Sequence, residues 1–445
     1  MLVCAGALLI YPVAAGAVTL SLRDAVARAL RDAPEAKIAE LEASKADDQA
    51  AAARSIYWPH AGVRSQAGWS SEQDSTIDAI NGKGQLKRYP LSAQGSSEPW
   101  LAVYFDQILF DLKQWRDVER AELEAEAADV AESEQHEGVS YAVVDRYVDV
   151  VRLEQLAAND RTKIADVEWL HRQAELLLQG GRALPEERER AAIELEQARL
   201  EADAHREQLE QARTALADAI GADPDEASAI TVDPTSLPTL DAAAVDRDAE
   251  AKVADAPALR ILGLRQRMED LAVKAARAGR YPTLGVRGGY FHYGTKRFDA
   301  FEQEVAIGVD VNVPVFDGFR TSRNIDSATK AAEAARLRYE AMRNDKRARV
   351  RELQRALRVA ARESALAERR VRIATERQRL ADMSLQAQRG TLAQALEARA
   401  ERARAALAAV DARLAGLRLW AQLQRETGRL KSSLVEDAAA PTAEP

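Results

Sequence analysis

Apolar residues recur at helical spacing along most of the chain and alternate with polar residues in only a few short segments. Helical spacing predicts helices over 21–58, 111–179, 185–220, 248–280, 318–389 and 391–427. Alternation predicts strands over 60–72, 99–110, 283–296 and 301–315. The pattern therefore indicates a mainly α-helical protein with a small β part.

The predicted long helices carry apolar residues at coiled-coil spacing. Two such seams recur every seven residues: Leu195, Ala202, Leu209 and Leu216, and Val359, Leu366, Ile373 and Leu380. Arg and Glu fill the other faces. A hairpin of two helices can bury one narrow seam but no thick core, so we expect these helices to pack side by side with neighbours.

The last predicted strand has two different faces. Val305, Ile307 and Val309 point one way, whereas Asp310 and Asn312 point the other way. About ten residues suffice for a tilted strand to cross a membrane. An ordinary sheet packed on helices shows the same alternation, so both alternatives stay open here. Four strands cannot close a membrane barrel, which needs about eight, so several chains would have to share one.

The order of elements occurs twice. Asp32-Ala33-Pro34 recurs as Asp255-Ala256-Pro257, and Phe110-Asp111 recurs as Phe316-Asp317. We therefore expect the chain to divide into a signal peptide (1–17), a first repeat (18–221), a linker (222–247), a second repeat (248–428) and a disordered tail (429–445).

The amino terminus is typical of an exported protein. Residues 1–17 are apolar and end in Ala15-Gly16-Ala17, a cleavage pattern for a secretory signal. Cys4, the single cysteine, lies inside this segment, so the mature chain has no thiol chemistry. No later stretch approaches 18 apolar residues, so we expect no transmembrane helix.

Composition and motifs exclude several classes of function. The net charge of −9 provides no basic field for nucleic acid. The five histidines lack metal-ligand spacing, and no nucleophile motif is present. We expect no enzyme activity, no cofactor and no metal site.

The segment Val313-Pro314-Val315-Phe316-Asp317-Gly318, together with the duplicated element order, resembles the outer-membrane efflux channels, the TolC family. The resemblance implies a homotrimer in which four strands per chain form one shared 12-stranded transmembrane β-barrel. The long helices would continue as an α-helical tunnel through the periplasm of a Gram-negative bacterium. Such a channel would be the exit duct of a tripartite efflux pump or a type I secretion system. Its partners would be a periplasmic adaptor, an inner-membrane pump or ABC transporter, and outer-membrane lipid.

The resemblance also implies candidate sites. In the family, acidic residues after a Gly-Thr turn form a constriction at the periplasmic end, and the matching positions here are Gln394 and Glu397. Arg389 and Arg399 flank this turn and could pair with acids to hold it closed. The helix-tip turns would contain Gly180, Gly181 and Gly390. Asp310 and Asn312 would face the barrel lumen, and Pro314, Phe316, Asp317 and Gly318 would form the strand-to-helix junction.

Each candidate also has an ordinary structural interpretation. Glu397 could be a solvated helix residue, and the two arginines could be surface cations. For the whole chain, the alternative is a soluble periplasmic coiled-coil scaffold or adaptor without a pore. That alternative requires a sheet that the chain's own helices cover.

Overall fold

The computed structural model describes residues 18–66, 76–80, 86–90, 100–180, 184–238, 249–295, 300–387, 389 and 391–436. The predicted signal peptide, Gly181 and Gly390 lie outside these residues. The chain divides into two units, described separately below. The helical unit comprises Met1–Ser44, Ala127–Gly263 and Leu337–Pro445, and the sheet unit comprises Lys45–Glu126 and Leu264–Arg336.

Helices account for most of the described residues. They are α1 (Leu22–Asp32), α2 (Pro34–Ala53), α3 (Leu112–Gln179), α4 (Pro185–Ala219), α5 (Ala249–Lys252), α6 (Pro257–Ala278), α7 (Arg320–Gln386) and α8 (Leu392–Glu426). The strands are β1 (Val18–Leu20), β2 (His60–Gln66), β3 (Thr76–Ile80), β4 (Leu86–Pro90), β5 (Trp100–Phe110), β6 (Ile230–Val232), β7 (Thr283–Thr295) and β8 (Ala300–Asn312).

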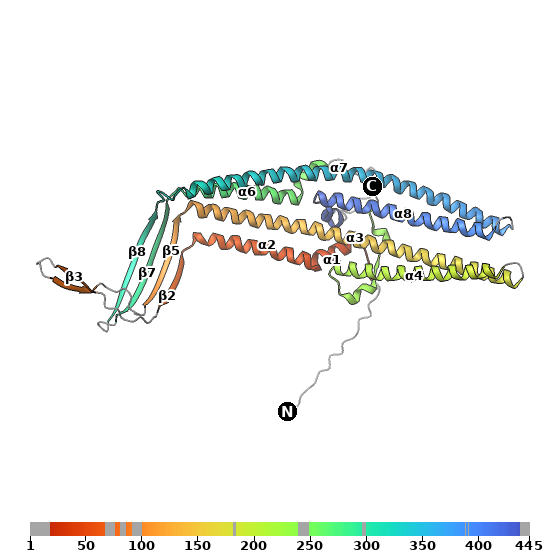
Figure 1. The fold of residues 1–445 in the computed structure, drawn as a ribbon, viewed down its shortest axis with the longest axis horizontal. Helices are drawn as coiled ribbons and strands as arrows, with labels where there is room; N and C mark the ends of the chain where they lie inside the picture. Colours follow the sequence, from red (N-terminus) through yellow and green to blue (C-terminus); the bar gives the residue numbers. More distant parts are fainter. Residues whose placement is uncertain are drawn as a thin grey trace, which may run out of the picture. The chain divides into compact units, whose positions relative to one another are not determined.

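In the helical unit, α4, α3, α8 and α7 lie side by side in that order (Figure 1). Ion pairs join each helix to the next: Lys163 with Glu201, Arg152 with Asp411, and Lys346 with Glu426. Beneath these pairs, a core cluster includes the fully buried Val143, Tyr147, Leu216 and Ile220. The two repeats therefore meet through α3 and α8.

Proline divides the two predicted shorter helices, contrary to the prediction of single helices over 21–58 and 248–280. Ala33 and Ala256 are both extended, with ψ of 134° and 132°. Each precedes a proline that begins the next helix, because proline disfavours a helical residue before it and lacks the N–H group of a helix interior.

We call each of these helix breaks before a proline a joint. At each joint, a glycine from the same repeat packs closely against the chain. Gly221 follows α4 at φ 65°, and a Cβ there would lie 2.6 Å from the carbonyl carbon of Asp32. Gly428 follows α8 at φ 68°, and a Cβ there would collide with the Pro257 ring. The repeated sequence motif thus marks a repeated packing joint that only glycine fits.

Within a single chain, the predicted seam of α7 is not the row of residues that is buried. α7 buries Leu353, Ala360, Ala367 and Ala374, which recur every seven residues, and leaves the predicted Val359, Leu366, Ile373 and Leu380 about half exposed. Alanine allows the neighbouring helix to approach closely. The larger side chains beside this buried row keep about half of their surface exposed.

The linker and the tail contain structure that the sequence analysis missed. β6, within the predicted linker, pairs in parallel with β1. The expectation of disorder from residue 429 is wrong as far as Glu436, because Ser432–Glu436 form a helical turn and Leu430 and Leu434 are buried in the core. Buried leucines are the physical reason that this part of the tail is ordered.

The sheet unit contains an antiparallel sheet in the order β2-β5-β7-β8 (Figure 1). The pairing of β5 with β7 joins the strands of the two repeats. β8 ends at Asn312, before Pro314 and earlier than predicted. The predicted strand 60–72 is described only to Gln66, and its remainder lies outside the described residues. β3 and β4 pair with each other in a separate sheet.

Much of the apolar face of the four-stranded sheet is exposed. Val305 and Ile307 are 80% and 77% exposed, and Val309 and Leu101 are also exposed on this face. Gln107, a polar residue on this face, donates from its amide to the backbone carbonyl of Ile108. The hydrophobic alternation along these strands therefore does not serve packing within the chain.

Candidate functional site

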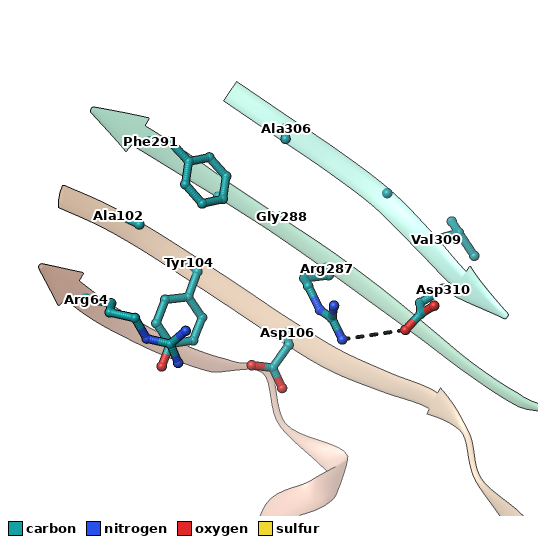
Figure 2. A pocket seen from close by; sticks show the side chains of 12 residues that line it. Arg64, Ala102, Tyr104, Asp106, Arg287, Gly288, Phe291, Ala306, Val309 and Asp310 are labelled. Carbon is teal, nitrogen blue, oxygen red and sulfur yellow. Dashed lines mark ion pairs between the residues drawn. The ribbon is translucent and has the colours of Figure 1, made fainter. Parts of the chain in front are cut away.

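The opposite face of the sheet is polar and forms a hollow of about 650 Å³ (Figure 2). Its larger side chains come from four strands: Arg64 from β2, Tyr104 and Asp106 from β5, Arg287 and Phe291 from β7, and Asp310 from β8. Strand register places these residues on one face, because Arg287 lies opposite both Asp106 and Gly308.

Small residues form the floor of this hollow. Ala102, Gly289, Ala306 and Gly308 lie between the larger side chains. The Tyr104 ring lies over Gly62, where a Cβ would come within 2.6 Å of the tyrosine oxygen. Glycine and alanine therefore leave room for the aromatic and charged side chains above the sheet.

Only some of the charges lining the hollow are paired. Arg287 and Asp310 form an ion pair, with Nη2 3.5 Å from Oδ2. The Arg64 guanidinium lies 5.2 Å from the centre of the Tyr104 ring, a cation–π distance. Asp310 and Asn312, both predicted to face a lumen, lie on this polar side, and Asn312 pairs with Thr283 at the end of β8.

The two repeated Phe-Asp pairs begin the two long helices. Asp111 accepts hydrogen bonds from the backbone N–H groups of Lys113 and Gln114, at 3.0 and 3.1 Å. Asp317 accepts one from Thr321 at 2.8 Å. Both carboxylates therefore satisfy N–H groups that a helix start leaves free.

The second junction is the more strongly bent one. Pro314 and Phe316 are exposed, and Gly318 and Phe319 both have positive φ, 65° and 67°. Two successive left-handed residues turn the chain sharply before α7 begins at Arg320. The first junction lacks Pro and Gly, yet it keeps the aspartate cap.

At the α7–α8 turn, the predicted gate residues have different surroundings. Glu397, Gln394 and Arg389 are exposed. Thr391 and Gln394 form a capping box, in which each side chain accepts a hydrogen bond from the other residue's backbone N–H. Gln394 therefore has a structural role at the start of α8. Gly180, at the end of α3, is exposed.

Arg399 is the predicted gate residue with the most contacts. It forms ion pairs with Asp166 of α3 at 2.7 Å and with Asp382 of α7 at 3.2 Å. The hydrogen bond to Asp166 is the largest effect that raises the pKa of the Arg399 guanidinium above its ordinary value. A single side chain on α8 therefore ties three helices together.

Sequence reasoning missed the other polar links between α3 and α8. Arg418 donates hydrogen bonds to Asp145 at 2.7 Å and to Asp149 at 2.5 Å, and Gln422 donates to Tyr141 at 2.8 Å. The acids at 145 and 149 follow the i, i+4 spacing that places two side chains on one helix face. That spacing was a signal, but no local pattern indicates which helix faces the two acids.

Other kinds of site find no support among the described residues. No described group of three or more His, Cys, Asp or Glu side chains is arranged to hold a metal ion. None of the described helices combines the length and the apolar character needed to cross a membrane.

Comparison with known proteins identifies a domain in the second half of the chain. Residues 250–429, which include α6, β7, β8, α7 and α8, match the family model described as outer membrane efflux protein. The chain carries an outer membrane efflux protein domain. No curated protein matches the sequence.

Solved structures extend the likeness in fold beyond the efflux protein domain. VceC, an outer membrane protein of Vibrio cholerae, is 18% identical with a TM-score of 0.71, over 92% of this chain and 96% of VceC. The CmeC outer membrane channel of Campylobacter jejuni is 15% identical with a TM-score of 0.71, over 92% and 86%. The MtrE outer membrane channel of Neisseria gonorrhoeae is 18% identical with a TM-score of 0.64, over 95% and 93%. The chain therefore has the fold of outer membrane channels over nearly its whole length.

Proposed function

We propose that three copies of this chain form an outer-membrane efflux channel, with their sheets joined in one transmembrane barrel and their helices in a tunnel that reaches into the periplasm. The observation that carries the proposal is the exposed apolar face of the sheet. Contiguous exposed apolar surface of this kind marks contact with lipid or a partner. The efflux protein domain favours lipid.

The sheet also leaves two edges open. β2 and β8 are its outermost strands, and each has one side without a partner in the four-stranded order. Open edges are a hazard in water and cannot exist in lipid, where every backbone group needs a partner. Pairing β8 of one copy with β2 of the next removes both edges.

The outer helices suggest how the tunnel closes. α7 exposes Val359, Leu366, Ile373 and Leu380, and α4, at the other end of the helix row, exposes Ile193 and Leu200. Each set recurs every seven residues, as coiled-coil contacts do. A second copy that places α4 against α7 would cover both sets.

In this channel, Asp310 and Asn312 face the lumen, and the α7–α8 turn lies at the periplasmic end. Three Glu397 carboxylates around a narrow opening would attract cations, and Arg399 would hold α8 against α3 and α7. A periplasmic adaptor and an inner-membrane pump or ABC transporter would contact the helix turns. Whether the pathway is efflux or protein secretion depends on those partners.

The alternative of a soluble scaffold fits the structure poorly. It requires helices over the sheet, yet Val305 and Ile307 are almost fully exposed. The family is one of outer membrane efflux proteins and not of enzymes. The exposed face and the family therefore both favour the channel.

Reconstitution in planar lipid bilayers tests the proposal. The purified protein should form ion-conducting pores whose appearance depends on the trimer. Ile373→Gln should weaken the trimer, whereas the neighbouring exposed Arg372→Gln should leave it unchanged, as measured by mass in detergent. A monomer that dissolves without detergent and forms no pore would refute the proposal.

A further inference from the structure

We infer that the hollow on the polar face of the sheet binds aromatic zwitterions as they pass, which deepens the proposed function and rests on it. The hollow is lined by both signs of charge and by two aromatic rings. Its volume of about 650 Å³ lies within the range of small-molecule sites, about 300–1,000 Å³.

Two opposite charges in the hollow have no ionic partner. No described acid lies within ion-pair distance of Arg64, and no described base lies within that distance of Asp106. Arg287, which lies opposite Asp106 in the strand register, forms its ion pair with Asp310 instead. Arg64 can therefore bind an anion and Asp106 a cation, without breaking an existing pair.

Tyr104 lies next to both charged residues. Asp106 follows Tyr104 by two residues on the same strand face, and Arg64 lies against the Tyr104 ring. Figure 2 shows Arg64 against the Tyr104 ring and Asp106 to one side of them. A ligand that carries both charges on a flat aromatic body can place its ring against Tyr104 and meet both partners.

The floor of the hollow leaves space for such a body. A Cβ at Gly308 would meet no atom within 4 Å, and Ala306 and Ala102 are further small residues of the floor. Phe291 supplies a second aromatic wall on β7. Aromatic contacts of this kind are favourable when rings are offset or edge-to-face.

Three related probes separate the contributions of the two charges. Tryptophan carries both charges, tryptamine only the cation, and indole-3-propionate only the anion. Each is titrated onto single channels in planar bilayers at pH 7, and the half-blocking concentration is measured. Tryptophan should block at the lowest concentration of the three.

Variants of the two partners should remove this preference selectively. Arg64→Gln should raise the half-blocking concentration of tryptophan about three- to fivefold, the range expected for one exposed ion pair. In this variant tryptophan should block at the same concentration as tryptamine. In Asp106→Asn, tryptophan should block at the same concentration as indole-3-propionate. Arg64→Lys, which keeps the charge, should lie between the wild type and Arg64→Gln, and Val311→Ala on the opposite face should change nothing.

The outcomes distinguish this inference from the proposed function. Absence of any pore would refute the proposed function. Normal conductance with equal block by all three probes would overturn the zwitterion site and leave the channel standing. Normal conductance with a tryptophan preference that survives both Arg64→Gln and Asp106→Asn would overturn the assignment to this hollow.

Discussion

Arg399 donates a hydrogen bond from Nη1 to Oδ1 of Asp166 at 2.7 Å, although the two residues are 233 positions apart in the sequence. The contact joins α8 of the second repeat to α3 of the first. A second bond reaches Asp382 of α7. The three helices next to the α7–α8 turn are therefore held by one guanidinium group.

Arg399→Gln should loosen these helices. Both carboxylates would lose their cation, at a cost of about 0.5–1 kcal/mol for a partly exposed site. We expect longer or more frequent open periods in single-channel recordings of the reconstituted protein. Arg402→Gln, an exposed position on the same helix, is the control, and equal gating in both variants would show that Arg399 has no role in closure.

The close packing of Gly221 and Gly428 at the two joints leads to a prediction about stability. Gly221→Ala and Gly428→Ala should each destabilise the fold by about 2 kcal/mol or more, because left-handed backbone costs an L-residue about 1–2 kcal/mol and the added methyl group meets another helix. Thermal unfolding in detergent measures this.

Gly138→Ala is the matched control inside α3. A Cβ there meets only the Arg425 side chain, at 3.9 Å. Alanine should stabilise this helix position by about 0.5–1 kcal/mol. If all three variants behaved alike, the joints would not depend on glycine.

Glu137 contacts the C-terminal segment and makes the stability of the fold depend on pH. It is 4% exposed, and its carboxylate accepts hydrogen bonds from the backbone N–H groups of Leu430 at 2.8 Å and Lys431 at 3.2 Å. Burial raises the pKa of Glu137 above its ordinary value of 4.5, which the two hydrogen bonds only partly offset. A raised pKa means that protonation stabilises the folded state; this contribution is full below pH 4.5 and is lost as the pH rises through the raised pKa.

Glu137→Gln should therefore gain stability relative to the wild type as the pH rises from 4.5 toward neutrality, because the amide keeps an acceptor without a buried charge. Glu137→Ala should lose about 1–3 kcal/mol, because two N–H groups are left without a partner. Unfolding temperatures across this pH range test both. Parallel curves for wild type and Glu137→Gln would contradict the stated role of the charge.

Local patterns in the sequence predicted the individual elements well. The Phe-Asp pairs did lie where strands meet long helices, because an aspartate cap is a local interaction. The alternation along β8 correctly separated Ile307 from Asp310, because side-chain direction in a strand follows directly from position.

Features that depend on distant partners were not predictable. The heptad Val359–Leu380 has the spacing of a buried seam, but the buried row of α7 lies one position further along, at Ala360, Ala367 and Ala374. Tyr147 donates or accepts hydrogen bonds with Leu20, Asp233 and Ser236, and so anchors β1 and the linker. No pattern around Tyr147 indicates those partners, because they come from segments that are short and far away in the sequence.

Spin labels at two adjacent strand positions test the central claim most directly. Cys4, in the predicted signal peptide, is the single cysteine, so Ile307→Cys and Gly308→Cys can be labelled one at a time in the mature protein. In lipid vesicles, a label at 307 should be accessible to oxygen dissolved in the membrane, and a label at 308 to a water-soluble nickel complex. Equal access of the water-soluble complex to both labels would mean that the valine-rich face of β8 does not contact lipid. The proposal of a transmembrane channel would then be wrong.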